Sequence, residues 1–187
     1  VEGVGFKPYV AICNALNISW VLRTDNDIFS KTSVTPVKKY YAGISRGIGI
    51  VKDIGDNKTG LIEYWNQHSK ENEWPKDAEI PEEAKKLNEY IRTNIKDLGI
   101  FLSDVDLEND LASSELKDTL MNHYGKRDHD DLVNAMQKKK AENMMEFLTK
   151  NHKELSCLEE SKIVEPLTSL IRITTERTRP DNGERTN

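Results

Sequence analysis

Apolar positions near the start of the chain follow the order of a strand, a helix and a second strand. Lys7 to Leu16 carries apolar residues at helical spacing, and the strand-like run Ile18–Leu22 follows it directly. Val1-Glu2-Gly3 is typical of a strand end that turns at a glycine into this helix, so most of the first strand is missing from the chain. Because strand–helix–strand units of this kind are parallel, the pattern predicts an α/β fold.

Helical periodicity dominates the rest of the chain. The segment after Pro81 has the clearest apolar face, and Pro81 suits a first helical turn. Helices are expected over residues 37–49 (despite three glycines), 59–70, 81–96, 107–123, 129–137, 139–150 and 158–175. The other expected elements are a loop over 30–36, a polar linker over 71–80, a short buried strand over 100–102 and a disordered tail over 178–187.

Acidic side chains follow the first two strands. Asp25 and Asp27 come directly after the strand-like run, and residues spaced two apart leave a strand on the same side. Glu2 stands at the end of the preceding strand. Since the carboxyl ends of parallel strands are where open α/β sheets bind ligands, these carboxylates are expected at one edge. Adjacent carboxylates repel unless a cation lies between them, so the pattern predicts a Mg²⁺ or Mn²⁺ site.

The strand over residues 100–102 also runs into acids, namely Asp104, Asp106 and Glu108. Three strand ends that deliver carboxylates to one edge are typical of two-metal phosphodiester chemistry. The same Asp-x-Asp spacing recurs at Asp128 and Asp130, however, and an isolated pair of this kind is usually a solvated loop charge. The context of the strand ends therefore matters more than the spacing.

Composition narrows the possible functions. Hydrophobic residues make up 36% of the 187 residues and charged residues 32%, with a formal net charge of −5. This balance argues against binding nucleic acid through bulk positive charge, although metal bound by carboxylates leaves a nuclease possible. Cys13 and Cys157 form no paired motif, so a reducing cytoplasm is expected. The sequence has no apolar run of membrane-spanning length and no P-loop, so neither a membrane nor ATP at such a loop is expected.

Two further features are open to alternative interpretations. The run Lys138-Lys139-Lys140 at a predicted helix start could supply a cation for transition-state charge, or could be a solvated face. Trp65 and Trp74 could stack on bases, although packing in the core is the commoner use of such aromatics.

These acidic and lysine motifs together resemble a known family. Val1-Glu2-Gly3, a helix and a strand ending in Thr24-Asp25-Asn26-Asp27 resemble a Toprim domain, the fold shared by topoisomerases, bacterial primases and certain nucleases. Residues 100–111 are similar to the third acidic motif of OLD-family (overcoming lysogenisation defect) nucleases, and Lys140-Ala141-Glu142 to their lysine motif. The resemblance extends from residue 1 to about residue 148, and Val1–Lys7 is most similar to the nuclease subunits of Gabija anti-phage systems.

The resemblance implies a Toprim-like parallel sheet flanked by helices, with a C-terminal helical annex. The Toprim core is then expected over residues 1–110, with a helical insertion at about 59–96. The annex, which carries the lysine motif, is expected over residues 111–177, before the tail over 178–187.

The resemblance also implies metal ligands, all of them carboxylates: Glu2, Asp25, Asp27, Asp104, Asp106 and Glu108. The first three are expected to bind one Mg²⁺ or Mn²⁺, and Glu108 with one of the two aspartates before it to complete a second site. Many OLD relatives carry another acid four residues after the first glutamate, where this chain has Phe6. This departure leaves open whether one or two metals bind.

Three residues are implied to act in catalysis. Glu2 and Asp25 are the expected catalytic carboxylates, and Lys140 is the expected transition-state cation. Lys138 and Lys139 are the alternatives for that cation.

As a whole, the resemblance implies a metal-dependent DNA endonuclease or nickase of the cytoplasm, acting in anti-phage defence. The family joins an N-terminal ABC-type ATPase domain to this region, which agrees with the missing P-loop and the abrupt start at Val1. A homo-oligomer and a helicase-like partner subunit are further implied partners. The alternative from a different class is a non-catalytic Toprim-fold module for assembly, and within enzymes topoisomerase and primase functions stay open.

Overall fold

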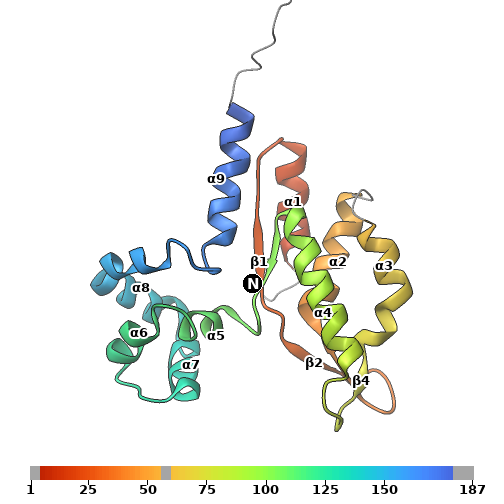
Figure 1. The fold of residues 1–187 in the computed structure, drawn as a ribbon, viewed down its shortest axis with the longest axis horizontal. Coiled ribbons are helices and arrows are strands. Elements are labelled where there is room, and N and C mark those ends of the chain that lie inside the picture. Colours follow the sequence, from red (N-terminus) through yellow and green to blue (C-terminus); the bar gives the residue numbers. More distant parts are fainter. Residues whose placement is uncertain (1–4, 56–59, 179–187) are drawn as a thin grey trace, which may run out of the picture.

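The computed structural model of the chain describes residues 5–55 and 60–178 (Figure 1). Glu2 and residues 179–187 of the predicted tail lie outside these ranges. The helices are α1 (Phe6–Ala15), α2 (Ala42–Ile54), α3 (Leu61–His68), α4 (Glu82–Ile95), α5 (Leu107–Ala112), α6 (Lys117–Tyr124), α7 (His129–Gln137), α8 (Lys140–Asn151) and α9 (Glu165–Thr178). Short 3-10 helices are η1 (Ser69–Asn72), η2 (Lys96–Leu98) and η3 (His152–Leu158).

The strands form two small sheets. In the first, β1 (Leu22–Thr24) pairs in parallel with β5 (Ile100–Leu102). The second is antiparallel, in the order β2 (Ile28–Lys31), β3 (Lys38–Tyr41) and β4 (Trp74–Pro75). The predicted fold class, a small parallel sheet flanked by helices, is confirmed.

Buried apolar side chains gather in two clusters, one on each side of β1 and β5. The first lies among α1 to α4 and the sheets, with Ile44, Leu87 and Ile100 at its centre. The second lies among α5 to α8 and includes Leu120 and Phe147. Figure 1 shows these helices on opposite sides of the parallel strands, with α9 projecting away. The candidate site must therefore be sought where the two halves meet, at the carboxyl ends of β1 and β5.

The first strand lies later in the chain than the apolar run predicted. Strand pairing starts only at Leu22, whose backbone N–H donates to the carbonyl of Gly99 at 2.8 Å. The partner strand β5 begins after Gly99, which has a positive φ of 75° and turns the chain out of η2. Within residues 5–55 and 60–178, no strand pairs with residues 18–21, and Trp20 Nε1 donates to Asn14 Oδ1 at 2.8 Å. The expected strand over 18–22 is thus wrong except for its last residue.

Residues 37–49 were expected to form one helix, but the structure divides them. Residues 38–41 form β3, because Tyr41 packs its ring against Trp74 of β4 with centroids 5.3 Å apart. The glycines of α2 explain its close packing: a Cβ on Gly43 would lie 2.5 Å from the carbonyl oxygen of Asp25, and one on Gly47 2.5 Å from Ile95. The loop predicted over 30–36 is also shorter, since β2 includes residues 30 and 31.

Two of the predicted C-terminal helices are shorter than expected. The helix over 107–123 is broken between α5 and α6, where Ser114 Oγ donates to the carbonyl of Leu111 and accepts from the N–H of Leu116. The last helix begins at Glu165 rather than at residue 158. Across the described residues, no helix has the length and apolar character needed to cross a bilayer.

Candidate functional site

Asp25 and Asp27 follow β1 in an extended segment that a buried asparagine holds in place. Asn26 Oδ1 accepts from the backbone N–H of Ile44 at 3.2 Å, and its Nδ2 donates to Asn88 Oδ1 at 2.8 Å. The amide thus ties the segment to α2 and α4, inside the first apolar cluster. Side chains alternate along extended chain, so Asp25 and Asp27 are only half-buried, on the side away from Asn26.

A second pair of acids comes from the start of α5. Asp106 caps this helix: its Oδ1 accepts from the backbone N–H of Asn109 at 2.7 Å, and its Oδ2 accepts from Gln137 Nε2 at 2.8 Å. Glu108, in the first turn, is buried, and its Oε1 lies 3.0 Å from Lys140 Nζ. Lys140 begins α8, so this ion pair joins α8 to the start of α5, the helix that follows β5.

These four acids influence one another electrostatically, and we call Asp25, Asp27, Asp106 and Glu108 the acidic cluster. Burial raises the pKa of Asp25, and the charges of Asp106 and Glu108 raise it further, against the opposing charge of Lys140. Burial and then the charge of Asp25 raise the pKa of Asp27. Burial is the largest cause of both raised pKa values, and repulsion among the carboxylates adds to it, so the cluster carries its negative charge at a free-energy cost that the facing cations do not remove.

Lys140 is held to the cluster by the same charges. Burial lowers its pKa, but the hydrogen bond and charge of Glu108, with the charges of Asp25 and Asp106, outweigh burial and raise it. Lys140 is therefore a cation at neutral pH. An ammonium has three donors, and only one of them is directed at Glu108.

The donor chemistry of the cluster fits a hard divalent cation. Carboxylate oxygens are the ligands that Mg²⁺ and Mn²⁺ prefer, and a cation would relieve the repulsion that raises the pKa values of Asp25 and Asp27. Among residues 5–55 and 60–178, no three His, Cys, Asp or Glu side chains are already arranged to hold a metal ion. Glu2, the remaining expected ligand, lies outside those ranges.

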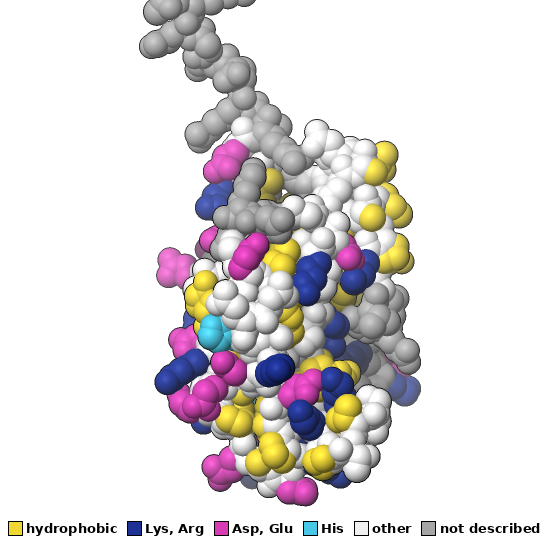
Figure 2. All heavy atoms as spheres, turned by 90° about the vertical axis from the view of Figure 1, so that its right-hand side faces the viewer, with side chains coloured by type: hydrophobic (Ala, Val, Ile, Leu, Met, Phe, Trp, Pro, Cys, Tyr) yellow, Lys and Arg dark blue, Asp and Glu magenta, His cyan; other side chains and the backbone are white. Residues whose placement is uncertain are grey.

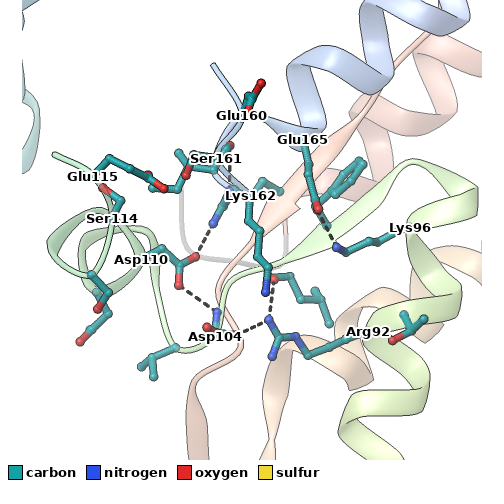
Figure 3. Close-up of a pocket in the computed structure, with 18 of the residues that line it drawn as sticks. Arg92, Lys96, Asp104, Asp110, Ser114, Glu115, Glu160, Ser161, Lys162 and Glu165 are labelled. Atoms are coloured by element: carbon teal, nitrogen blue, oxygen red, sulfur yellow. Dashed lines mark hydrogen bonds and ion pairs between the residues drawn. The ribbon is translucent and has the colours of Figure 1, made fainter. Parts of the chain in front are cut away.

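The structure does not bring Asp104 into the acidic cluster. Its carboxylate forms an ion pair with Arg92 of α4, and its backbone N–H donates to Asp110 Oδ1 at 3.1 Å. Asp110 in turn pairs with Arg23 of β1. Figure 3 shows Asp104 and Asp110 in a separate cavity of about 720 Å³, together with Arg92 and Lys96. We call Asp104 and Asp110 the arginine-paired acids.

The three lysines of the run have different surroundings. Lys138 is exposed, and Lys139 Nζ lies 3.1 Å from Glu142 Oε2. Of the three, Lys140 alone is paired with an acid of the cluster among the described residues. The geometry thus favours Lys140 over its two neighbours for the predicted role.

Sequence reasoning missed Arg46, which lies beside the cluster on α2. Its guanidinium donates to the carbonyl oxygen of Asp25, and its charge lowers the pKa of Asp27, although burial and Asp25 together raise that pKa more. The available signal was its position between Gly43 and Gly47. Glycines one turn apart mark the helix face that packs closely, and here Gly43 packs against the backbone of Asp25 and Asn26.

Comparison with known proteins gives one similarity. No protein-family model matches the chain. The chain is 29% identical over 181 residues to "Endonuclease GajA" of Bacillus cereus (strain VD045). The similarity covers 86% of this chain but only 28% of the length of that protein.

Proposed function

We propose that this chain is the catalytic module of a metal-dependent DNA endonuclease or nickase with a Toprim-like fold. The observation that carries the proposal is the acidic cluster at the ends of β1 and β5, whose carboxylates are partly desolvated, repel one another and hold Lys140 beside them. The similarity to a protein named as an endonuclease supports the same function. The resemblance of the motifs to OLD-family nucleases supplies DNA as the substrate and anti-phage defence as the context.

In this proposal Asp25 and Asp27, with Glu2, hold Mg²⁺ or Mn²⁺, and Asp106 and Glu108 provide carboxylates for a second ion. When bound, such ions activate water and stabilise the charge on phosphate oxygens. Asp106 has both oxygens occupied by donors from Asn109 and Gln137, so these neighbours fix its orientation.

Lys140 is proposed to stabilise the charge that develops on the scissile phosphate. Its Nζ donates to Glu108 Oε1, which fixes the direction of the ammonium and leaves its other hydrogens for phosphate oxygens. A preorganised cation in a partly desolvated site stabilises developing charge more than a solvated one does. Arg46 holds the backbone of Asp25 and so acts as a positioning residue.

The assembly around the module is also proposed from the resemblance. The chain is expected to act in a cytoplasmic protein that carries an N-terminal ABC-type ATPase domain, and to form a homo-oligomer. A helicase-like subunit is the proposed further partner.

Cleavage of supercoiled plasmid in Mg²⁺ or Mn²⁺ tests the proposal, with Asp25→Asn compared with the parent protein. We expect the variant to lose about 100-fold or more of the rate, since it removes a ligand and a charge from the cluster. Asp77→Asn is the matched control, because Asp77 is an exposed aspartate after β4, outside the cluster. If folded parent protein cuts in neither metal, or if Asp25→Asn cuts as fast as Asp77→Asn, the catalytic proposal fails and the non-catalytic assembly module takes its place.

A further inference from the structure

A groove of about 510 Å³ lies between the β2–β3 ribbon and the segment of α3 and η1. We call it the aromatic groove; its lining includes Lys31, Tyr40, Ser45, Trp65, Lys70 and Glu73. Tyr40 and Trp65 both line the groove and are both half-buried, and Trp65 packs against the first apolar cluster. Figure 2 looks at the side of the molecule that carries α3, where Lys and Arg side chains stand among acidic and apolar ones.

Contacts lead without interruption from the acidic cluster to this groove. Arg46 donates to the carbonyl of Asp25, and its guanidinium lies 5.9 Å from the centroid of the Phe29 ring. Phe29 of β2 is paired with Tyr40 of β3, and residues directly opposite in an antiparallel pair share a face of the ribbon. Tyr40 then lines the groove itself. Arg46, Phe29 and Tyr40 thus form a series of neighbouring side chains between the candidate site and the aromatic groove.

The groove is more positive than the chain as a whole. Glu73 is the one acid in the lining among the described residues, and it is shared by Lys31 at 2.5 Å and Lys38 at 3.1 Å. Lys70, also in the lining, is exposed. Among the described residues, the lining thus carries two lysines and one carboxylate, an excess of one positive charge, although the whole chain has a formal net charge of −5.

Buried hydrogen bonds make the floor of the groove rigid. Asn72 is buried, and its Nδ2 donates to the carbonyl of Tyr41 and to Ser45 Oγ, both at 3.1 Å. Its Oδ1 accepts from the backbone N–H of Tyr41 at 3.2 Å. The amide therefore joins β3, α2 and η1, and the groove does not need to form when a ligand binds.

We propose that the aromatic groove binds an unpaired strand of DNA and leads it to the acidic cluster, an inference that rests on the proposed function. Phosphates would contact Lys31, Lys70 and Arg46, and bases would stack on Tyr40 and Trp65. Rings and cations side by side in a groove are the combination that binds single strands. A duplex presents its backbone outward and keeps its bases stacked inside, so it cannot place bases on rings within a recess.

Binding is measured by fluorescence anisotropy with labelled oligo(dT) of about 20 nucleotides and a blunt duplex of the same length. All proteins carry Asp25→Asn, so that the probe is not cut in Mg²⁺. We expect the single strand to bind more tightly than the duplex. Tyr40→Leu and Trp65→Leu should each weaken single-strand binding about 10-fold, since each removes a stacking surface while keeping apolar bulk. Tyr9→Leu is the control, because Tyr9 is an aromatic residue 63% exposed on α1.

Lys70→Gln provides a test that does not disturb packing, because Lys70 is exposed. If Lys70 contacts a phosphate, the slope of log affinity against log salt should become less steep by about 0.7 for a single strand. Lys153→Gln in η3 is the matched control and should leave the slope unchanged.

The outcomes separate this inference from the proposed function. Equal binding of single strand and duplex, or folded Tyr40→Leu and Lys70→Gln variants that bind like their controls, overturns the aromatic groove even if the parent protein cuts plasmid. Conversely, if the parent protein cuts nothing while single-strand binding depends on Tyr40 and Lys70, the groove is supported and the catalytic proposal fails.

Discussion

Two groups of acidic side chains lie at the same edge of the β1–β5 sheet, and they differ in their counter-charges. The arginine-paired acids, Asp104 and Asp110, each face a guanidinium from the core, Arg92 and Arg23 respectively. The acidic cluster faces Lys140, and Arg46 lies beside it. These cations do not prevent the pKa values of Asp25 and Asp27 from rising.

The difference shows that the density of acids does not by itself indicate a metal site. Both groups have carboxylates spaced closely along the chain after a strand. Where an arginine pairs with each acid, as at Asp104 and Asp110, the carboxylates already have a counter-charge and act as structural links. Where carboxylates are partly desolvated and repel one another, a further cation lowers their free energy, and that is the condition for a metal site.

The largest expected effect is on catalysis, through Lys140. Lys140→Met should slow plasmid cleavage about 100- to 1000-fold, because it removes a preorganised cation beside the proposed scissile phosphate. Lys150→Met is the control on the same helix, since Lys150 pairs with Glu146 at 2.6 Å outside the acidic cluster and both side chains are exposed. Stability should also fall, by about 1–3 kcal/mol, because the buried carboxylate of Glu108 loses its partner, so both proteins are compared at a temperature at which they are folded. Parent-like cleavage by Lys140→Met would remove Lys140 from the mechanism.

The next effect is on stability, through the arginine-paired acids. Arg23 is 20% exposed and Asp110 11%, so Arg23→Met should lower the free energy of unfolding by about 2–4 kcal/mol, since it leaves a buried carboxylate unpaired. Arg23 also donates to the carbonyl of Ile163 at 3.0 Å, which ties β1 to the segment before α9. Urea unfolding measures the loss.

Arg92→Met is the comparison for that variant. The side chain of Asp104 is 76% exposed, so this substitution should cost only about 0.2–1 kcal/mol. Equal losses from the two arginine variants would contradict the assignment of Arg23 as a buried tie.

The sequence was most informative where local signals suffice. The α4 and α7 helices and the β5 strand lie within about two residues of their predicted bounds. Each has a clear pattern of apolar positions or a residue that caps the start of the helix. Asp128, for example, accepts from the backbone N–H of Asp130 and Asp131 at the start of α7. Such signals depend only on neighbours in the chain.

The sequence was least informative where partners are distant. Tyr41 belongs to a strand because of Trp74, and β1 begins at Leu22 because Gly99 ends the segment before its partner. For the candidate site, the position of the acids directly after strands predicted the edge of the sheet at which they lie. They could not distinguish Asp104 from Asp106, since the difference depends on Arg92, supplied by another helix.

The stabilisation of the protein by added Mn²⁺ is a smaller expected effect, and it also distinguishes the two groups of acids. At a concentration about 100 times its dissociation constant, Mn²⁺ should stabilise the protein by about 2.7 kcal/mol, a rise in Tm of about 5–10 °C. Asp25→Asn should lose most of this rise, because the cation is drawn to the acidic cluster. Asp104→Asn should keep it, since that carboxylate is already paired with Arg92. The reverse pattern would place the metal at the arginine-paired acids instead.

The smallest expected effect is the pH dependence of stability without divalent ions. The folded-state pKa values of Asp25 and Asp27 lie above their ordinary value of 3.8, so the folded protein binds these protons more tightly than the unfolded chain does. Their contribution to stability is therefore fully present below pH 3.8 and is lost as pH rises through the raised pKa values. A variant with Asp25→Asn and Asp27→Asn should be more stable than the parent at neutral pH, and its advantage should shrink on acidification.

Glu73 provides the opposite slope as a control for that experiment. The hydrogen bond from Lys31 lowers its pKa, although burial opposes it, so its contribution is present above the ordinary pKa of 4.5 and is lost as pH falls. Glu73→Gln should therefore be less stable than the parent at neutral pH and should approach it in acid. Thermal unfolding in a chelator from pH 7 to about pH 4 measures both differences. If the advantage of the double aspartate variant grew on acidification, the free-energy cost of negative charge inferred for the acidic cluster would be wrong, and with it the physical reason for a metal to bind there.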